Sequence, residues 1–82
     1  ASDVYKRQDY DRSVAVYDQV LAIEPDNAQA WANKGYALIK TGHVRDAVRA
    51  FDRSLELDPG NIDAKYGRLD AIRIFWPHYT VT

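Results

Sequence analysis

The chain has 82 residues, of which 46% are hydrophobic and 28% charged, with 11 basic and 12 acidic residues interleaved along it. A chain of this length forms one small domain that buries only about 60–65% of the surface its unfolded state exposes. The near-neutral charge argues against a nucleic-acid partner, which would favour a basic stripe, and the lack of cysteine excludes disulfides and thiolate metal sites.

The chain opens on the segment ASDVYKRQ, residues 1–8, which resembles the translated end of a sequencing adapter. No methionine precedes it or occurs elsewhere in the chain. We therefore predict that residues 1–8 are not native to the protein and expect the native gene to begin upstream. They are left out of the functional interpretation.

The next stretch, residues 9–27, recurs later in the chain with a period of 34 residues. Pro25 and Pro59 each follow an acidic residue and precede an asparagine by two positions, and laying residues 9–27 over residues 43–61 gives five identities. The matched apolar positions have helical spacing. Two unrelated amphipathic helices could share those apolar positions, but they would not readily share the Pro-x-Asn ending. The pattern therefore predicts a repeated helical unit.

Two helices are predicted in the middle of the chain. The first covers residues 28–41, because Asn27 is a suitable N-cap and Gly42 can adopt the left-handed conformation that closes a helix. The second covers residues 44–57. It is ended by Pro59, which lacks a backbone N–H and restricts the residue before it.

A further helix is predicted over residues 62–76, with Asn61 as its N-cap. The apolar side chains along one of its faces are Tyr66, Leu69, Ile72 and Phe75. Residues 77–82 show no periodicity, and we expect them to form a loose tail.

Five residues of the central segment have the spacing of a known signature: Trp31, Gly35, Ala47, Phe51 and Pro59. In this the sequence resembles the tetratricopeptide repeat family, whose pattern is Trp-x3-Gly-x11-Ala-x3-Phe-x7-Pro. Glycine inside a helix costs about 1 kcal/mol relative to alanine, so its presence needs a packing reason. We expect Gly35 and Ala47 to lie where the two helices come nearest, with Trp31 and Phe51 filling the space on either side.

The resemblance implies an all-α fold of antiparallel helix-turn-helix repeats, an α-solenoid fragment of about four helices. Residues 9–27 would be the second helix of a truncated repeat, residues 28–61 a complete repeat, and residues 62–76 the first helix of a further or capping repeat. This last piece departs from the signature, because Lys65 and Leu69 replace the Trp and the Gly. Each repeat buries its apolar face only against its neighbours, so we expect weak folding or self-association of the truncated repeats.

No catalytic or metal-binding constellation is present in the sequence. His43 and His78 lie in a predicted turn and tail without a second ligand at suitable spacing, and no phosphate-binding glycine loop occurs. We therefore predict no enzyme activity, no cofactor and no metal site. Arg45, Arg49 and Arg53 recur at i, i+4 spacing beside acidic residues. They indicate a salt-bridged, solvated face, with contact to an acidic partner as the alternative. No apolar run approaches the roughly 20 residues that span a bilayer, so a cytoplasmic location without membrane contact is expected.

The resemblance also implies a function, because the first helices of such repeats line a concave groove that binds a peptide or a partner protein. The predicted partner-binding residues are Gln29, Asn33, Tyr36, Lys40, Tyr66 and Asp70. Ala32, Asp63 and Gly67 are expected to face the same groove. Asn33 can exchange hydrogen bonds with an extended backbone, the tyrosine rings offer flat apolar area, and Lys40 can meet a carboxylate.

Some relatives grip a terminal carboxylate with a clamp of basic and amide side chains. Asn33 matches one clamp position, but Asp63 and Gly67 stand where a lysine and an arginine are needed, so this specific function is not favoured. A protein-interaction scaffold is the predicted function. The alternatives are an arm of a larger enzyme or sensor, glycosyltransferase- or kinase-like, and a membrane-tethered assembly factor. Only the Ile74-Phe75-Trp76 stretch suggests the last of these.

Overall fold

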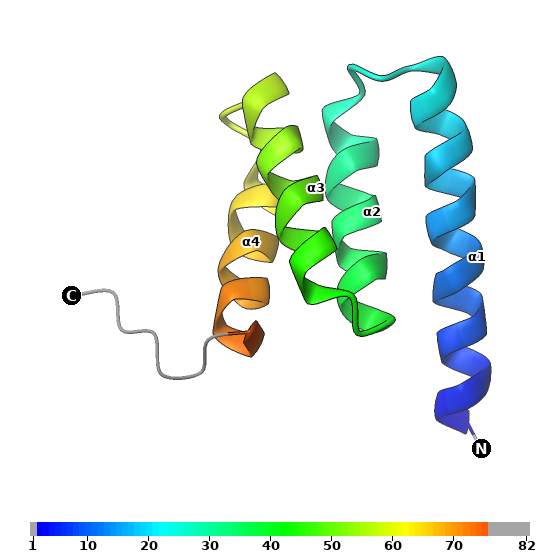
Figure 1. Cartoon of the computed structure of the whole chain (residues 1–82). Helices are drawn as coiled ribbons and strands as arrows, with labels where there is room; N and C mark the ends of the chain where they lie inside the picture. Colours follow the sequence, from blue (N-terminus) through cyan, green and yellow to red (C-terminus); the bar gives the residue numbers. More distant parts are fainter. Residues whose placement is uncertain (1, 76–82) are drawn as a thin grey trace.

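The computed structural model describes residues 2–75, and the side chains of residues 8–75. This part of the chain consists of four helices: α1 (Ser2–Ile23), α2 (Ala28–Lys40), α3 (Val44–Leu57) and α4 (Ile62–Phe75). Successive helices run in opposite directions and lie side by side (Figure 1). The predicted all-α fold is confirmed. Trp76 and the predicted tail, residues 77–82, which includes His78, lie outside the described residues.

The turns between the helices are built as the sequence predicts. The side-chain carbonyl oxygen of Asn27 accepts a hydrogen bond from the Ala30 N–H at 2.9 Å, and Asn61 caps α4 in the same way through Ala64 at 2.9 Å. Gly42 has a φ of 84°, the left-handed conformation that closes α2. Helix α2 ends at Lys40, one residue earlier than predicted.

Helix α1 is longer than the sequence predicts, because it begins at Ser2 rather than near residue 9. Residues 2–8 contain neither glycine nor proline, so each one can extend an existing helix by one backbone hydrogen bond. Their helical conformation does not depend on their origin. Their non-native origin stays a prediction.

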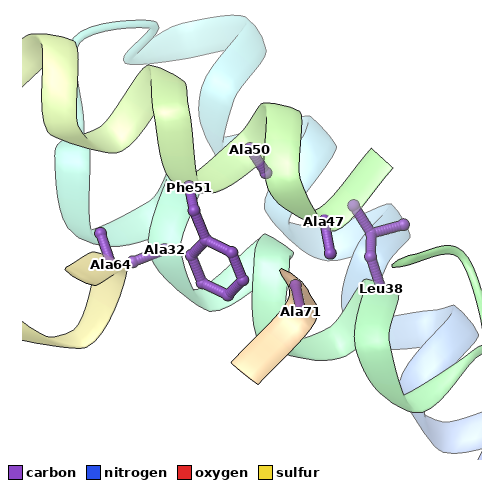
Figure 2. Close-up of a cluster of buried hydrophobic side chains, with 7 residues drawn as sticks. All are labelled: Ala32, Leu38, Ala47, Ala50, Phe51, Ala64 and Ala71. Atoms are coloured by element: carbon purple, nitrogen blue, oxygen red, sulfur yellow. The ribbon is translucent and has the colours of Figure 1, made fainter. Parts of the chain in front are cut away.

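Phe51 forms the centre of the core. Its side chain has no exposed surface and lies among small residues and one leucine (Figure 2). The cluster around it is Ala32, Leu38, Ala47, Ala50, Ala64 and Ala71. A Cβ atom on Gly35 would lie 2.6 Å from the Phe51 ring, and one on Gly67 would also collide with it. The ring is therefore held between α2 and α4, and neither helix could carry a side chain at that point.

This geometry adds detail to the predicted packing of Gly35. The nearest atoms to a Cβ on Gly35 belong to the Phe51 ring, and Ala47 is fully buried in the same cluster. The predicted exposed positions of Ala32 and Gly67 are wrong. Both are buried, because the close packing of α2 and α4 around Phe51 uses their small size.

Ion pairs join the helices at two places that are related by the repeat. Lys34 Nζ of α2 lies 2.6 Å from the Asp18 carboxylate of α1, and Arg68 Nε of α4 lies 2.6 Å from the Asp52 carboxylate of α3. Both members of the first pair precede their counterparts by 34 residues. The α1–α2 and α3–α4 contacts are therefore two copies of one arrangement.

Candidate partner-binding site

Polar side chains join α2 and α4 along one face. Gln29 Nε2 donates hydrogen bonds to Asp63 Oδ2 and to Asn33 Oδ1, each at 3.0 Å. The side-chain oxygen of Gln29, Oε1, accepts a hydrogen bond from Asn61 Nδ2 at 3.2 Å. The Tyr36 hydroxyl donates to the Asp63 backbone carbonyl at 2.9 Å. The structure thus brings three of the predicted binding residues, Gln29, Asn33 and Tyr36, into one hydrogen-bonded group with α4.

Tyr36 is the residue that fixes this face to the core. Its ring meets the Phe51 ring edge-on, with centroids 5.2 Å apart and planes at 79°. Burial raises the pKa of the Tyr36 phenol above its ordinary value of 10.0, and the carboxylates of Asp63 and Asp70 raise it further. The hydroxyl is therefore a neutral donor at physiological pH.

Lys40 lies at the other end of α2, in a groove between α1 and α2. The groove has a volume of about 200 Å³. Its lining residues, which define what we call the Tyr17 groove, are Tyr10, Ser13, Tyr17, Asn33, Tyr36, Ala37 and Lys40. Lys40 is exposed and forms no ion pair with any residue that the structure describes. It is the only charged side chain among the lining residues.

The α1 residues of the Tyr17 groove were missed by sequence reasoning. The family pattern assigns binding positions to first helices, whereas α1 matches a second helix. A signal was nevertheless present, because Tyr10, Ser13 and Tyr17 have helical spacing and line up with Val44, Ala47 and Phe51 of α3. These residues carry hydroxyl groups at the positions of buried or partly buried apolar ones, which could have indicated an open surface.

The two predicted binding residues of α4 differ in their surroundings. Asp70 is exposed and lies close enough to Tyr36 to raise the pKa of its phenol. Tyr66 is 63% exposed, and it makes no hydrogen bond or ring contact with the other predicted residues in the described part of the chain. Tyr66 therefore offers an apolar surface beside the hydrogen-bonded group without belonging to it.

The predicted binding residues supply amide donors and acceptors, tyrosine rings, a lysine on α2 and carboxylates on α4. Among residues 8–75, no group of three histidine, aspartate or glutamate side chains could hold a metal ion. Within the same part of the chain, no helix has the length and apolar character needed to cross a membrane.

A stack of antiparallel helices with a period of 34 residues defines a helical-repeat protein. Residues 5–71 match the family model described as tetratricopeptide repeat. The chain therefore belongs to the tetratricopeptide repeat family. Domains of this family mediate protein–protein interactions and are not catalytic in themselves.

Several characterised proteins contain a similar segment. The chain is 27% identical over 62 residues to the peroxisomal targeting signal receptor of Eremothecium gossypii. The aligned segment covers 76% of this chain and 11% of the receptor. The chain is 31% identical over 68 residues to human serine/threonine-protein phosphatase 5, covering 83% of this chain and 14% of the phosphatase. It is 27% identical over 75 residues to the Arabidopsis thaliana Hsp70-Hsp90 organizing protein 3, covering 92% and 13%. The chain thus spans only a small part of the length of these relatives.

Proposed function

We propose that this chain binds a peptide segment of a partner protein on the face formed by α2 and α4. The observation that carries the proposal is the hydrogen-bonded group of Gln29, Asn33, Tyr36 and Asp63, which joins the two helices. A preformed surface loses little conformational entropy when a ligand binds. The polar atoms of such a group can also exchange hydrogen bonds with an extended backbone.

Charge on this face supports a choice among peptides. Lys40 stands at the end of α2, whereas Asp63 and Asp70 place carboxylates on α4. Complementary charges contribute mainly to specificity and to the rate of association. A peptide with an acidic side chain toward Lys40 and a basic one toward Asp70 fits this arrangement, with an apolar side chain on Tyr66.

The relatives support a protein partner. One is named as a receptor for a targeting signal and another as an organizing protein for Hsp70 and Hsp90. The carboxylate clamp is not part of the proposal, because Asp63 holds a position that needs a basic side chain and Gly67 is buried. The alternative, an arm of a larger enzyme or sensor, is not favoured by these relatives, since what they share with this chain is the repeat.

The proposal is tested by selecting binders from a random 12-residue peptide library against the whole chain. The selected peptide is then titrated against Lys40→Glu, Asp70→Lys and Tyr66→Ala. All three side chains are exposed, so circular dichroism should show unchanged helix content. We expect each variant to weaken binding by roughly threefold to tenfold, as for contacts worth about 1 kcal/mol. Failure to select any peptide would contradict the proposal. Variants that bind the selected peptide as tightly as the wild type would also contradict it.

Self-association of the chain is a separate proposal. It rests on exposed apolar side chains such as Ile23 (83% exposed) and Ile62 (65% exposed). Sedimentation velocity over a range of concentrations tests it directly. A single monomeric species at every concentration would exclude it.

A further inference from the structure

Three side-chain amides are linked by hydrogen bonds across α2 and α4, those of Gln29, Asn33 and Asn61. A side-chain amide carries an oxygen that accepts and a nitrogen that donates, so its orientation decides which ligand atoms it can recognise. The orientation of all three amides follows from the two groups that border them, a backbone N–H and a carboxylate.

The first fixed point is the N-cap of α4. The side-chain oxygen of Asn61 accepts a hydrogen bond from the backbone N–H of Ala64 at 2.9 Å, and a backbone N–H can only donate. The amide nitrogen of Asn61 is therefore directed away from the cap. It donates to Gln29 Oε1 at 3.2 Å, which places the oxygen of Gln29 toward Asn61.

The second fixed point is the Asp63 carboxylate, which can only accept hydrogen bonds. Gln29 Nε2 donates to Asp63 Oδ2 at 3.0 Å, so Asp63 and Asn61 select the same orientation of Gln29. The second N–H of Gln29 donates to Asn33 Oδ1, also at 3.0 Å. Gln29 thus uses both of its donors and its oxygen within this group.

The consequence falls on Asn33, the last amide of the group. Its oxygen is bound by Gln29, and the opposite orientation of Asn33 would bring two nitrogen donors together. Its amide nitrogen donates no hydrogen bond to the residues that the structure describes. Asn33 is only half-buried and lines the Tyr17 groove, so these N–H groups are accessible to a ligand.

We propose that Asp63 is a positioning residue for recognition: through Gln29, it holds Asn33 with its amide nitrogen toward the ligand. The inference rests on the proposed function, the binding of a peptide by α2 and α4. The ligand group selected at Asn33 is a hydrogen-bond acceptor, such as a backbone carbonyl oxygen, and not an N–H donor. A lysine at position 63 can only donate, so it would not orient Gln29 in this way.

The test exchanges the two fixed points in the whole chain, as the double variant Asn61→Asp/Asp63→Asn. Composition and net charge stay the same, and aspartate is as good an N-cap as asparagine, so helix content should not change. The carboxylate now at position 61 attracts the nitrogen of Gln29, and the amide at position 63 donates to its oxygen. We expect Gln29 to reverse. Asn33 then donates to Gln29 and turns its oxygen toward the ligand.

The first measurement needs no ligand. Exchange of the side-chain amide protons with water is followed by NMR in the wild type and in the double variant. In the wild type the Gln29 protons should exchange more slowly than those of Asn33, because only the former are hydrogen-bonded within the chain. The double variant should slow the exchange at Asn33 by roughly threefold to tenfold, the effect of one ordinary hydrogen bond. Unchanged exchange at Asn33 would overturn the proposal, whether or not a peptide binds.

The second measurement is the affinity of the peptide selected from the random library. The double variant should bind it roughly threefold to tenfold more weakly, through the loss of one hydrogen bond. In an Asn33→Ala background the same exchange of residues should have no effect, because the two changes act through one side chain. An equal loss in both backgrounds, or no loss in either, would overturn the proposal. If no peptide can be selected, the proposed function fails, whereas amide exchange still decides the orientation of Asn33.

Discussion

The α1–α2 and α3–α4 pairs repeat the same ion pair and the same N-cap, yet only the second encloses its aromatic residue. Phe51 is fully buried between two glycines, whereas Tyr17 borders an open groove. The same local contacts therefore do not produce equal burial of the aromatic ring. Phe51 is buried because α2 also covers it. Stability should be concentrated in α2, α3 and α4. Among the described helices α1 packs only against α2, so its stability should depend on that one interface.

The sharpest test of this comparison truncates both aromatic residues. Phe51→Ala removes a ring from a closed core, and we expect a loss of about 3–5 kcal/mol in the free energy of unfolding. For a small domain this is a large share of the free energy of unfolding. Tyr17→Ala should cost only about 1–2 kcal/mol, since its ring is already partly hydrated. Urea denaturation followed by circular dichroism measures both, and equal losses would contradict the comparison.

The close approach of α2 to Phe51 is tested by Gly35→Leu. We expect a loss of about 3 kcal/mol, because the new side chain would begin 2.6 Å from the Phe51 ring. Gly60→Ala is the control. A Cβ there lies 3.5 Å from the Asp58 carboxylate, and the φ angle of Gly60 is not positive. If Gly35→Leu were as stable as Gly60→Ala, Phe51 would not be clamped as described.

The repeated ion pairs should contribute less, and by similar amounts. Asp52→Asn and Asp18→Asn each break a partly exposed pair, for which about 0.2–1 kcal/mol is expected. Double-mutant cycles with Arg68→Gln and Lys34→Gln isolate the coupling energies. The coupling should decrease in high salt. A large coupling in one pair and none in the other would show that the two pairs are not equivalent.

The smallest effect should come from the Tyr36 phenol. Its pKa is raised in the folded chain, first by burial and then by Asp63 and Asp70, so folding favours the protonated form. Its contribution to stability is therefore complete below the unfolded-state pKa of about 10 and is lost as the pH rises through the folded pKa. Spectrophotometric titration of tyrosinate in the wild type and Tyr36→Phe measures the shift. A pKa at or below the ordinary value would be inconsistent with the contacts of Tyr36.

The helices and turns could be predicted from local rules, whereas the contacts between helices could be predicted only in part. Asn27, Gly42 and Asn61 act through bonds within a few residues, so their roles follow from the sequence. Gly67 was expected to face the groove because the 34-residue period makes it the counterpart of Asn33, a predicted binding position. Position 67 needs a glycine because α4 packs directly against the Phe51 ring there, which the sequence spacing alone does not reveal.

The same difference between local rules and contacts between helices applies to the predicted binding face. Gln29, Asn33 and Tyr36 were predicted from the family pattern. The hydrogen bonds of Gln29 and Tyr36 to Asp63 could not be predicted, because they depend on how α2 and α4 are aligned along their axes. Tyr10 and Tyr17 were missed because the pattern for second helices describes buried positions. Their exposure follows from the absence of a covering helix among the described residues, a property of the assembly and not of α1 itself.

The central proposal is that α2 and α4 form one recognition face. It is tested most directly by adding the selected peptide to the isotope-labelled chain and mapping amide chemical shifts. The account predicts that the largest changes fall on Gln29, Asn33, Lys40, Tyr66 and Asp70, with the amides of α3 little affected. Changes concentrated on α3, or spread evenly over the four helices, would contradict it.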